Sequence, residues 1–219
     1  MSSPTRLFLV GTGGHARSVL EVAAHRFSRE QVVLLDDAVP AGTRVELGVV
    51  QGDAEWCLAA CTEDDWFFVA VGHGALREAV VHRLAGCRAR PCTLIDPRAI
   101  VATDAVVGPG SVVMPGAVLR TGVRLGQHCI VNTGAILDHE CEVEDFAGVS
   151  PAAAIGGNVR IARGAFVGIG ACVAHRLEIG PYAVVGAGST VLDDVATGTL
   201  TAGSPARVVR HVPRDYRYV

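Results

Sequence analysis

The hydrophobic residues of this chain follow two patterns, and the longer one runs from Ile95 to Val191. Every sixth residue of this stretch is aliphatic, without a break. A helix repeats at about 3.6 residues and a lone amphipathic strand at about 2, so neither explains this period as one element. It fits short strands joined by tight turns, with three strands to a coil and the coils stacked along an axis. The aliphatic residues, called anchors below, are Ile95, Val101, Val107, Val113, Leu119, Leu125, Val131, Leu137, Val143, Val149, Ile155, Ile161, Val167, Val173, Ile179, Val185 and Val191.

Small residues and glycines accompany the anchors at fixed places. A small residue usually stands four positions after the anchor, and a glycine often follows the anchor directly. We expect the anchor and the small residue to fill a narrow prism, and the glycine to stand at a corner where positive φ is required. Stacked strands lie roughly 4.8 Å apart, so each residue should meet the equivalent residue of the next coil. The glycines concerned are Gly108, Gly126, Gly156, Gly168, Gly180 and Gly186.

Before the repeat, short hydrophobic strands alternate with helical patterns, which predicts parallel βαβ units. We therefore expect a Rossmann-like α/β domain over residues 1–94, a β-helix over 95–210 and a C-terminal tail over 211–219. The polar character begins at Arg207, after a predicted turn at Gly203-Ser204-Pro205-Ala206. The predicted strands are 6–10, 31–35, 48–50, 66–71 and 92–95, and the predicted helices lie near 18–23 and 76–84.

Composition narrows the class of protein. The chain has 219 residues and a formal net charge of -3, without a block of Lys or Arg, which argues against a nucleic-acid-binding surface. Its start has no long apolar segment, so we expect neither a signal peptide nor a membrane span. The seven cysteines include no CxxC pair. We therefore expect a cytoplasmic protein with reduced thiols.

A glycine-rich loop after the first strand is a candidate phosphate site. The pattern Gly11-x-Gly13-x-x-Ala16 lies between a strand and a helix. Its glycines would let the backbone approach an anion, and the helix N-terminus would supply free N–H groups. The alternative is a tight βα turn that needs glycine only for packing. The domain is about half the size of a full dinucleotide fold, so a mononucleotide or a nucleotide sugar fits better.

Two further loops should lie at the same edge of the predicted sheet. Asp36 and Asp37 end the second strand. Their distance from the glycine loop along the chain suits contact with a sugar hydroxyl or the edge of a base. Gly72 lies in the loop after a later strand. Ligands of open α/β sheets bind at the carboxyl ends of parallel strands, where these residues are expected.

His139 is the candidate for acid–base chemistry within the repeat. It stands two positions after an anchor and should face outward. A histidine with a pKa near neutrality can take a proton from an amine or a hydroxyl, and a nearby carboxylate would fix its tautomer. Either Asp138 or Glu140 could provide that carboxylate. Gly157 is the neighbour one coil on, and its missing side chain should leave space for a bound thioester. The alternative is a surface histidine without a role.

A metal site at His139 is not expected. Zinc needs three or four ligands that converge on the ion. The neighbours of His139 in the adjacent coils are Thr121 and Gly157, and His175 is two coils away.

Taken together, these motifs resemble the sugar O/N-acyltransferase family over nearly the whole chain. That family includes acetyltransferases of nucleotide-linked 4-amino-4,6-dideoxy sugars and sialic acid O-acetyltransferases. The resemblance implies a left-handed parallel β-helix after the Rossmann-like domain. The matching stretches are Gly11–Ala16, Asp36-Asp37, Val71-Gly72, Asn132-Thr133-Gly134, Asp138-His139-Glu140-Cys141, Gly156-Gly157-Asn158-Val159 and Gly203-Ser204-Pro205-Ala206.

The resemblance also implies roles for individual residues. His139 would be the general base and Glu140 would modulate its basicity. Acetyl-CoA, as co-substrate, would lie along the prism between two subunits of a homotrimer. The expected nucleotide-sugar contacts are Gly13, Gly14, His15, Asp36, Asp37 and Gly72, and the expected acetyl-CoA contacts are Asn132, Gly157, Gly168, Ile169 and Ala187.

The chain departs from the family pattern at three places. Gly148 stands where many members have a second histidine, which affects a CoA contact. His175-Arg176 replaces a common Pro-Gly. Gly72-His73-Gly74 replaces an asparagine-rich loop of some members, which affects the identity of the sugar or the base.

The sequence therefore predicts an acetyl-CoA-dependent N-acetyltransferase without a metal. Its substrate would be the 4-amino group of a nucleotide-activated 4-amino-4,6-dideoxy sugar, in bacterial surface-glycan biosynthesis. The nearest alternative is a sugar O-acetyltransferase of the sialic acid type. A non-catalytic nucleotide-sugar-binding protein is the third possibility.

Overall fold

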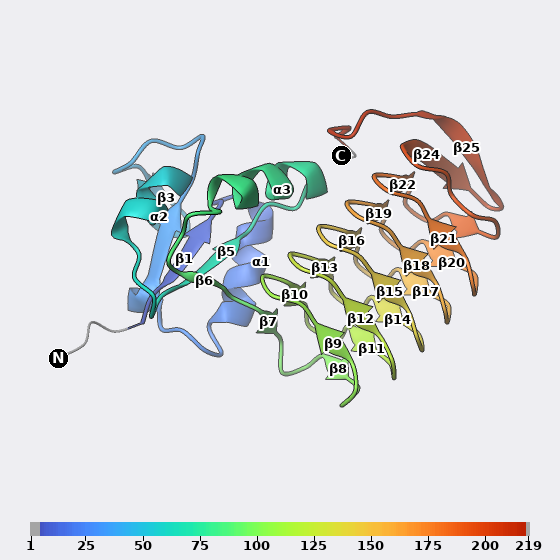
Figure 1. Cartoon of the computed structure of the whole chain (residues 1–219), viewed down its shortest axis with the longest axis horizontal. Coiled ribbons are helices and arrows are strands. Elements are labelled where there is room, and N and C mark those ends of the chain that lie inside the picture. The colour runs from blue at the N-terminus through green and yellow to red at the C-terminus, as the bar shows by residue number, and fades with distance from the viewer. Residues whose placement is uncertain (1–4, 218–219) are drawn as a thin grey trace.

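The computed structural model describes residues 5–217, which form an α/β part followed by a column of short strands (Figure 1). The α/β part contains one six-stranded sheet, in the order β3-β4-β2-β1-β5-β6, in which only β3 runs antiparallel to its neighbour. Its elements are β1 (Leu7–Val10), α1 (Gly14–Ala23), η1 (Arg29–Gln31), β2 (Val32–Leu35), β3 (Arg44–Val45), β4 (Gly48–Gly52), α2 (Ala54–Ala60), β5 (Trp66–Val69), α3 (Gly74–Arg83) and β6 (Arg90–Pro91).

Helices cover both faces of this sheet. Leu7 and Leu9 of β1 pack in one buried cluster with α1, whereas Phe8 and Val10 pack in another with α2 and α3. This alternation follows from the strand geometry, in which successive side chains point to opposite faces. The structure confirms the predicted Rossmann-like class. The helix α2 and the short strands β3 and β6 were not predicted.

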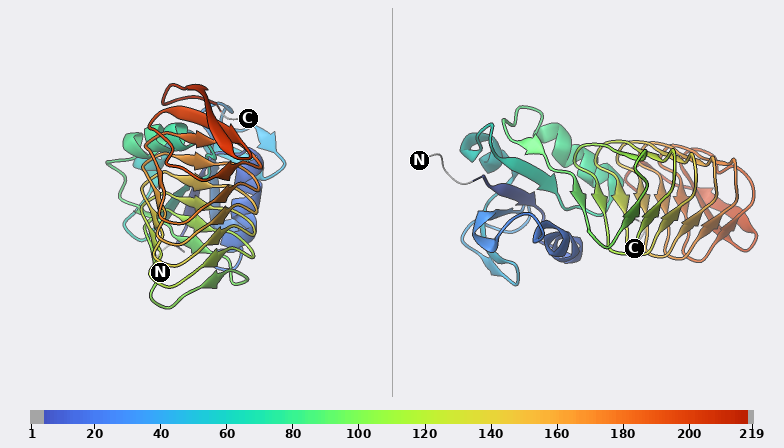
Figure 2. Two further views of the ribbon diagram at one scale, coloured as in Figure 1. Left: turned by 90° about the vertical axis from the view of Figure 1, so that its right-hand side faces the viewer. Right: turned by 90° about the horizontal axis from the view of Figure 1, so that it is seen from below.

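The repeat forms the predicted parallel β-helix (Figure 2). Each strand pairs with the strand one coil on, so that Leu119 lies beside Leu137 and Leu137 beside Ile155. The strands are β7 (Leu94–Ile95), β8 (Ile100–Val101), β9 (Val106–Val107), β10 (Val112–Val113), β11 (Val118–Leu119), β12 (Arg124–Leu125), β13 (Ile130–Val131), β14 (Ile136–Leu137), β15 (Glu142–Val143), β16 (Gly148–Val149), β17 (Ala154–Ile155), β18 (Arg160–Ile161), β19 (Phe166–Val167), β20 (Cys172–Val173), β21 (Glu178–Ile179), β22 (Val184–Val185), β23 (Thr190–Val191), β24 (Thr199–Gly203) and β25 (Ala206–His211).

The prism has three faces with different outer surfaces. The covered face contains β7, β10, β13, β16, β19, β22, β24 and β25, and its outward residues Val112 and Ile130 share a buried cluster with α1. The apolar face contains β8, β11, β14, β17, β20 and β23. The charged face contains β9, β12, β15, β18 and β21, and carries outward side chains such as Arg160, which pairs with Glu178. The α/β part therefore occupies one face only.

The anchors fill the prism from Val113 onward, but the first coil is open. Val113 and Val191 are almost fully buried, whereas Ile95 is 44% exposed. Val101 and Val107 are only partly buried against the core. The prediction that every anchor is interior is therefore wrong at the start of the repeat, because no coil lies beneath the first one to cover its side chains.

The glycines directly after the anchors have a different role from the one expected. Positive φ occurs three positions after the anchor, as at Gly116, and several non-glycine residues adopt it there, including Glu140 (φ 58) and Asn158 (φ 59). Glycines such as Gly108 and Gly126 have no positive φ. A Cβ on Gly108 would instead stand 2.3 Å from the carbonyl oxygen of Gly126. These glycines are needed because adjacent coils approach too closely for a side chain.

The predicted polar tail is partly a strand. β25 pairs antiparallel with β24 across a turn with a cis Ser204-Pro205 peptide bond, which matches the predicted turn. Residues from 207 to 211 therefore belong to the sheet, since pairing with β24 satisfies their backbone groups. The segment beyond returns to α3, where Arg214 pairs with Glu78 and the Nε2 atom of His73 lies 2.8 Å from the Tyr216 carbonyl oxygen. Residues 1–4 and 218–219, where the predictions on the chain start and the last of the tail fall, lie outside the described residues.

No helix within residues 5–217 is both long enough and apolar enough to cross a membrane.

The junction of the two parts is built around a buried arginine. Arg77 of α3 is 1% exposed and donates to carbonyl oxygens of both parts. Its Nε atom reaches His128 at 2.8 Å and its Nη2 atom reaches Phe146 at 2.6 Å, both in the prism. Its Nη1 atom reaches Val71 and Gly72 at 2.7 and 2.9 Å. One side chain thus binds the loop after β5 to the corner of the β-helix.

Two histidines at this junction are buried in a way that disfavours protonation. Burial, and then the nearby charge of Arg77, lower the pKa of His15 and of His128 to about 4. The His128 ring stacks on Phe146 with centroids 5.4 Å apart, and its Nδ1 atom has no hydrogen-bond partner among the described residues. Both side chains are therefore neutral at pH 7.

The close approach of the coils gives a first prediction. Gly108→Ala should lower the free energy of unfolding by about 1–3 kcal/mol, because the new methyl group would overlap backbone of the next coil. Gly116→Asn should cost less than about 1 kcal/mol, since residues at the equivalent place already adopt positive φ and the site is open. Chemical denaturation of both variants measures the difference. Equal losses would contradict the packing explanation.

The buried histidines give a second prediction, on pH. Their pKa is lower in the folded than in the unfolded chain, so below about pH 6.5 the unfolded chain binds more protons and stability falls. Each histidine should contribute a loss of up to about 1.4 kcal/mol per pH unit between pH 6 and 4.5. His128→Phe keeps the stacking and should reduce the slope of unfolding free energy against pH, whereas the exposed control His175→Gln should not. An unchanged slope in His128→Phe would contradict this assignment.

Candidate functional site

His139 lies at the edge between the apolar and charged faces, where the chain turns from β14 into β15. Its Nδ1 atom is 3.3 Å from Oε2 of Glu140. Neighbouring residues on a strand would point apart, but Glu140 has φ 58, which turns its carboxylate back toward the imidazole. Of the two carboxylates left open by the sequence, the structure therefore selects Glu140. Asp138 instead accepts a hydrogen bond from the His139 backbone N–H, at 2.8 Å.

Asn158, one coil on, completes this group and was not predicted as a site residue. Its Nδ2 atom donates to Oε2 of Glu140 at 3.1 Å and lies 3.4 Å from Nδ1 of His139. The contact follows from the repeat, since Asn158 occupies the same corner position as Glu140. A carboxylate on Nδ1 favours the tautomer in which Nδ1 carries the proton and Nε2 is free to accept one.

Gly157 lies beneath the imidazole of His139. A Cβ at this position would stand 2.4 Å from Nε2 and 2.5 Å from Cε1 of His139. The missing side chain thus makes room for the catalytic candidate itself, and the prediction that it leaves space for a thioester needs this correction. No described residue accepts a hydrogen bond from the Gly157 N–H.

A second group of predicted residues lines a cavity of about 570 Å³ between the α/β part and the covered face. His15 and Gly72 reach it from the α/β part, and Asn132 and Ile169 from the edge between the covered and apolar faces. The Nε2 atom of His15 is buried there without a partner among the described residues. The remaining lining, mostly apolar, is His73, Ile130, Gly148, Val149, Ser150, Pro151 and Phe166.

The glycine loop is open where a ligand would approach. Gly13 precedes α1 and Gly14 begins it, without a side-chain cap on the helix N-terminus. A Cβ on either glycine would have no neighbour within 4 Å, so packing within this chain does not require them. Gly11 differs, because it has φ 110 and its Cβ would stand 2.9 Å from the Ala70 carbonyl oxygen. The first N–H groups of an α-helix have no partner within the helix, so the start of α1 is suited to bind an anion next to the cavity lined by His15.

The two predicted aspartates are already engaged. Asp36 accepts from the backbone N–H and the hydroxyl of Thr12 at 2.9 and 2.7 Å, and from two backbone N–H groups after β2. Asp37 pairs with Arg83 at 2.7 Å. Both line a hollow that shares no residue with the cavity at His15. Asp36 thus holds the glycine loop in place, and neither carboxylate is free in this structure.

Gly168 and Ala187 lie at the same edge as Ile169. A Cβ on Gly168 would stand 2.7 Å from the backbone nitrogen of Ala187, so this glycine is required by the close coils. Ile169 is 59% exposed and projects from the edge. The predicted acetyl-CoA contacts therefore divide between two edges, with Gly157 at one and Asn132, Gly168, Ile169 and Ala187 at the other.

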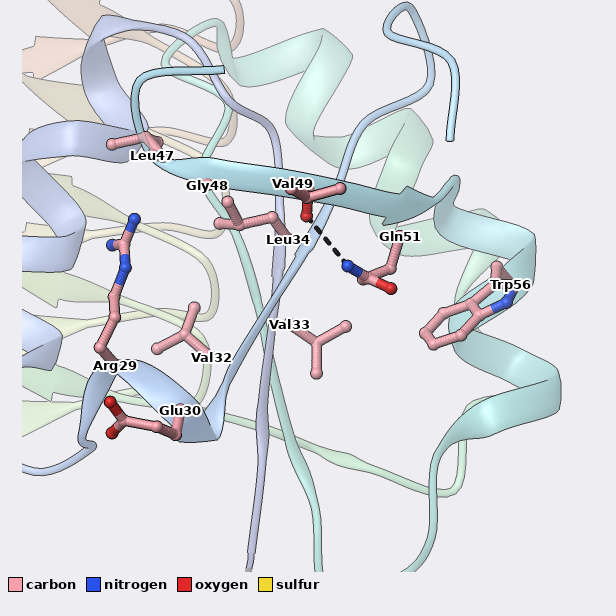
Figure 3. A pocket seen from close by; sticks show the side chains of 10 residues that line it. All are labelled: Arg29, Glu30, Val32, Val33, Leu34, Leu47, Gly48, Val49, Gln51 and Trp56. Carbon is pink, nitrogen blue, oxygen red and sulfur yellow. Dashed lines mark hydrogen bonds between the residues drawn. The ribbon is translucent and has the colours of Figure 1, made fainter. Parts of the chain in front are cut away.

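Another hollow, of about 380 Å³, lies on the sheet between β2, β4 and α2 and contains none of the predicted residues (Figure 3). Arg29 lines one end of it and Trp56 the other. It presents no group suited to acyl transfer.

Comparisons with known proteins give one matching family model and several similar solved structures. The family model "PglD N-terminal domain" matches residues 6–84. No curated protein sequence matches the chain. The acetyltransferase domain of PglB from Neisseria gonorrhoeae FA1090 is 33% identical with a TM-score of 0.85, over 93% of this chain and 99% of that one.

Two further solved structures are similar over the same length. One is a histidine-to-alanine mutant of GDP-perosamine N-acetyltransferase from Caulobacter crescentus in complex with CoA and GDP-perosamine. It is 30% identical, with a TM-score of 0.85, over 94% of this chain and 97% of that one. WeeI from Acinetobacter baumannii AYE is 23% identical with a TM-score of 0.87, over 94% of this chain and all of that one, and shows the fold alone.

The identity to PglB and to GDP-perosamine N-acetyltransferase extends over both the α/β part and the β-helix. The predicted family is thereby confirmed: this chain belongs to the PglD-type sugar N-acyltransferases with a hexapeptide-repeat β-helix.

Proposed function

We propose that this protein transfers the acetyl group of acetyl-CoA to the 4-amino group of a nucleotide-activated 4-amino-4,6-dideoxy sugar, in bacterial surface-glycan biosynthesis. The observation that carries the proposal is the contact between Nδ1 of His139 and Glu140, which leaves Nε2 without a hydrogen-bond partner among the described residues. Relatives over the whole chain support it, since one contains CoA and GDP-perosamine and another acetyl coenzyme A. The cytoplasmic location expected from the sequence belongs to the same proposal.

The reaction needs one proton acceptor and one group that stabilises the oxyanion. The Nε2 atom of His139 takes the proton from the sugar amine as its nitrogen attacks the thioester carbonyl. The C–N bond forms, the C–S bond breaks, and the proton passes to the CoA sulfur. Glu140, bound by Asn158, orients the imidazole and stabilises its charged form. The unpaired N–H of Gly157 beneath the ring is our candidate donor to the oxyanion.

The two substrates would approach along the groups described above. The N-terminus of α1 at Gly13 and Gly14 suits the phosphates, and the cavity with His15, Gly72 and Asn132 lies beside it. The apolar lining of this cavity suits a deoxy sugar better than a fully hydroxylated one. Acetyl-CoA would follow the exposed Ile169 and the backbone of Gly168 and Ala187.

The similarity to GDP-perosamine N-acetyltransferase favours N-acetylation over O-acetylation of a sialic acid. A purely binding role is less consistent with the structure, since it would not require the three-residue contact of His139, Glu140 and Asn158. Gly148 lies in the cavity, where the absence of a side chain enlarges the space for ligand.

A homotrimer would join the two halves of the proposed site. His139 and the group around Ile169 lie at opposite edges of the apolar face, and no helix or strand within residues 5–217 packs on its outer side. Its outward residues include Ile100 and Ile136, which are 65% and 43% exposed. Contact between copies through this face would bury such residues and bring the His139 edge of one copy to the Ile169 edge of the next. The outward column is Ile100, Val118, Ile136, Ala154, Cys172 and Thr190.

The assembly is our third prediction. Light scattering at micromolar concentration should give a mass three times that of the chain. Ile136→Glu should weaken assembly and acetyl transfer together, because it places charge in the apolar face. The matched control Glu142→Gln, on the charged face, should leave the mass unchanged. A monomeric wild-type protein with full activity would contradict the shared site.

The role of His139 is our fourth prediction. His139→Ala should lower kcat by about 10²–10⁴-fold with little change in acetyl-CoA affinity, because a general base contributes to rate and not to binding. Glu140→Gln and Asn158→Ala should cost less, since each acts through the imidazole. Release of CoA thiol with candidate amino sugars measures the rate.

His175→Gln is the matched control, because His175 stands at the same corner two coils on. It should retain wild-type kcat. If His139→Ala retained most activity with the true acceptor, the proposed base would be wrong.

A further inference from the structure

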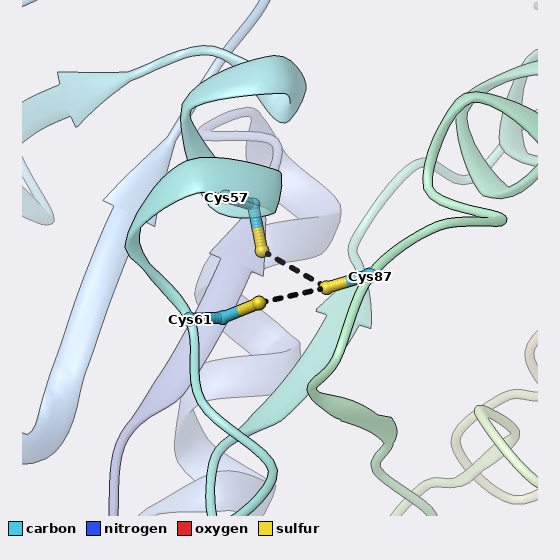
Figure 4. Close-up of side chains that lie close together, drawn as sticks. All are labelled: Cys57, Cys61 and Cys87. Carbon is cyan, nitrogen blue, oxygen red and sulfur yellow. Dashed lines mark hydrogen bonds between the residues drawn. The ribbon is translucent and has the colours of Figure 1, made fainter.

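Three thiols converge in the α/β part, away from the proposed acetyl-transfer site (Figure 4). Cys57 lies in α2, Cys61 ends that helix, and Cys87 follows α3. The Sγ atom of Cys87 is 3.3 Å from that of Cys61 and 3.6 Å from that of Cys57, and all three lie within 4.8 Å of one another. The i, i+4 spacing of Cys57 and Cys61 in a helix explains why two of them are adjacent.

The separations suit a single bound ion. Sulfur ligands about 2.3 Å from one ion stand roughly 3.8–4.0 Å from each other in tetrahedral or trigonal geometry. To reach this arrangement, the Sγ atoms of Cys61 and Cys57 must each move away from that of Cys87 by about 0.2–0.7 Å, while their own separation of at most 4.8 Å is already close to the range. No histidine or carboxylate of residues 5–217 joins the group as a fourth ligand.

The surroundings favour a soft ion of low charge. Cys57 and Cys61 are fully buried in the cluster of Phe8, Val69 and Leu84, whereas Cys87 is half-buried and offers a route to solvent. Thiolates select soft ions such as Cu(I) and Zn(II), and zinc sites normally have four ligands. The guanidinium of Arg6 lies near this group, since its Nη2 atom binds the carbonyl oxygen of Ala60 at 2.9 Å next to Cys61, but its charge is already balanced by Asp65 at 2.7 Å.

We propose that Cys57, Cys61 and Cys87 form a three-thiolate site for a soft metal ion, with Cu(I) preferred over Zn(II). Binding converts three thiols to thiolates and releases three protons, and it changes no oxidation state. The ion would connect α2 to the segment after α3, so it would stabilise the sheet that carries the glycine loop. This inference does not depend on the proposed acetyl transfer.

The test is a titration of the reduced full-length protein with Cu(I) buffered by a chromogenic chelator. A Cys172→Ser background removes the exposed thiol of the β-helix. We expect one equivalent bound per chain, a rise in Tm, and three Cu–S contacts without nitrogen or oxygen ligands by X-ray absorption. Zn(II) should bind at least tenfold more weakly under the same conditions.

Variants separate the site from general thiol binding. Cys87→Ser changes the most accessible ligand and should lower Cu(I) affinity at least 100-fold and abolish the rise in Tm. Cys61→Ala tests a second ligand, and circular dichroism verifies that both variants are folded. Cys92→Ala, a buried thiol of the same part, should bind as the background does.

Failure to bind one equivalent would overturn the proposal, as would Cu(I) binding by Cys87→Ser or Cys61→Ala that is as tight as binding by the Cys172→Ser background. Tighter binding of Zn(II) would overturn the preference for copper. A Cys61–Cys87 disulfide that forms in preference to metal binding in the presence of a thiol reductant would also overturn it.

Discussion

The narrow interior of the prism is the constraint on which the rest of the structure depends. It has room for one aliphatic side chain and one small residue at each turn, so anchors such as Leu119, Leu137 and Ile155 must stack in register. This packing sets both the distance between coils and the phase of every outward residue. Asn158 reaches Glu140 for this reason alone, since the two occupy the same corner in adjacent coils. The contacts among the polar side chains at the His139 edge therefore follow from the packing of the prism interior.

Arg77 connects that regular column to the irregular α/β part. A guanidinium can be buried at low cost only if its donors find acceptors, and here the carbonyl oxygens of Val71, Gly72, His128 and Phe146 accept from Arg77. The same charge helps keep His15 and His128 neutral. The position of Gly72 in the cavity, and the state of the His15 ring beside it, therefore both depend on one side chain of α3.

The sequence predicted what is periodic or local and missed what depends on distant contacts. The six-residue period specified the β-helix, and the glycine loop specified the first βα unit. Alternation along a strand could not tell whether Glu140 contacts His139, because the contact needs positive φ at Glu140. The role of Arg77 could not be predicted, since its acceptors are backbone atoms and those in the β-helix lie 51 and 69 residues along the chain. The pair Cys57 and Cys61 carried a local signal, a C-x-x-x-C spacing in a helix, but Cys87 joins them only in the fold.

The division of the proposed site between two edges has a physical consequence for catalysis. In one chain, His139 and Ile169 border the same apolar face but stand on opposite sides of it. A site assembled from two copies would let each edge stay rigid, because each belongs to a packed column, while substrate contacts form across the gap between columns. Positioning would then depend on the flat apolar face and not on flexible loops. The proton acceptor would be preorganised by Glu140 and Asn158 within one copy, and association would supply the acyl donor at the correct distance.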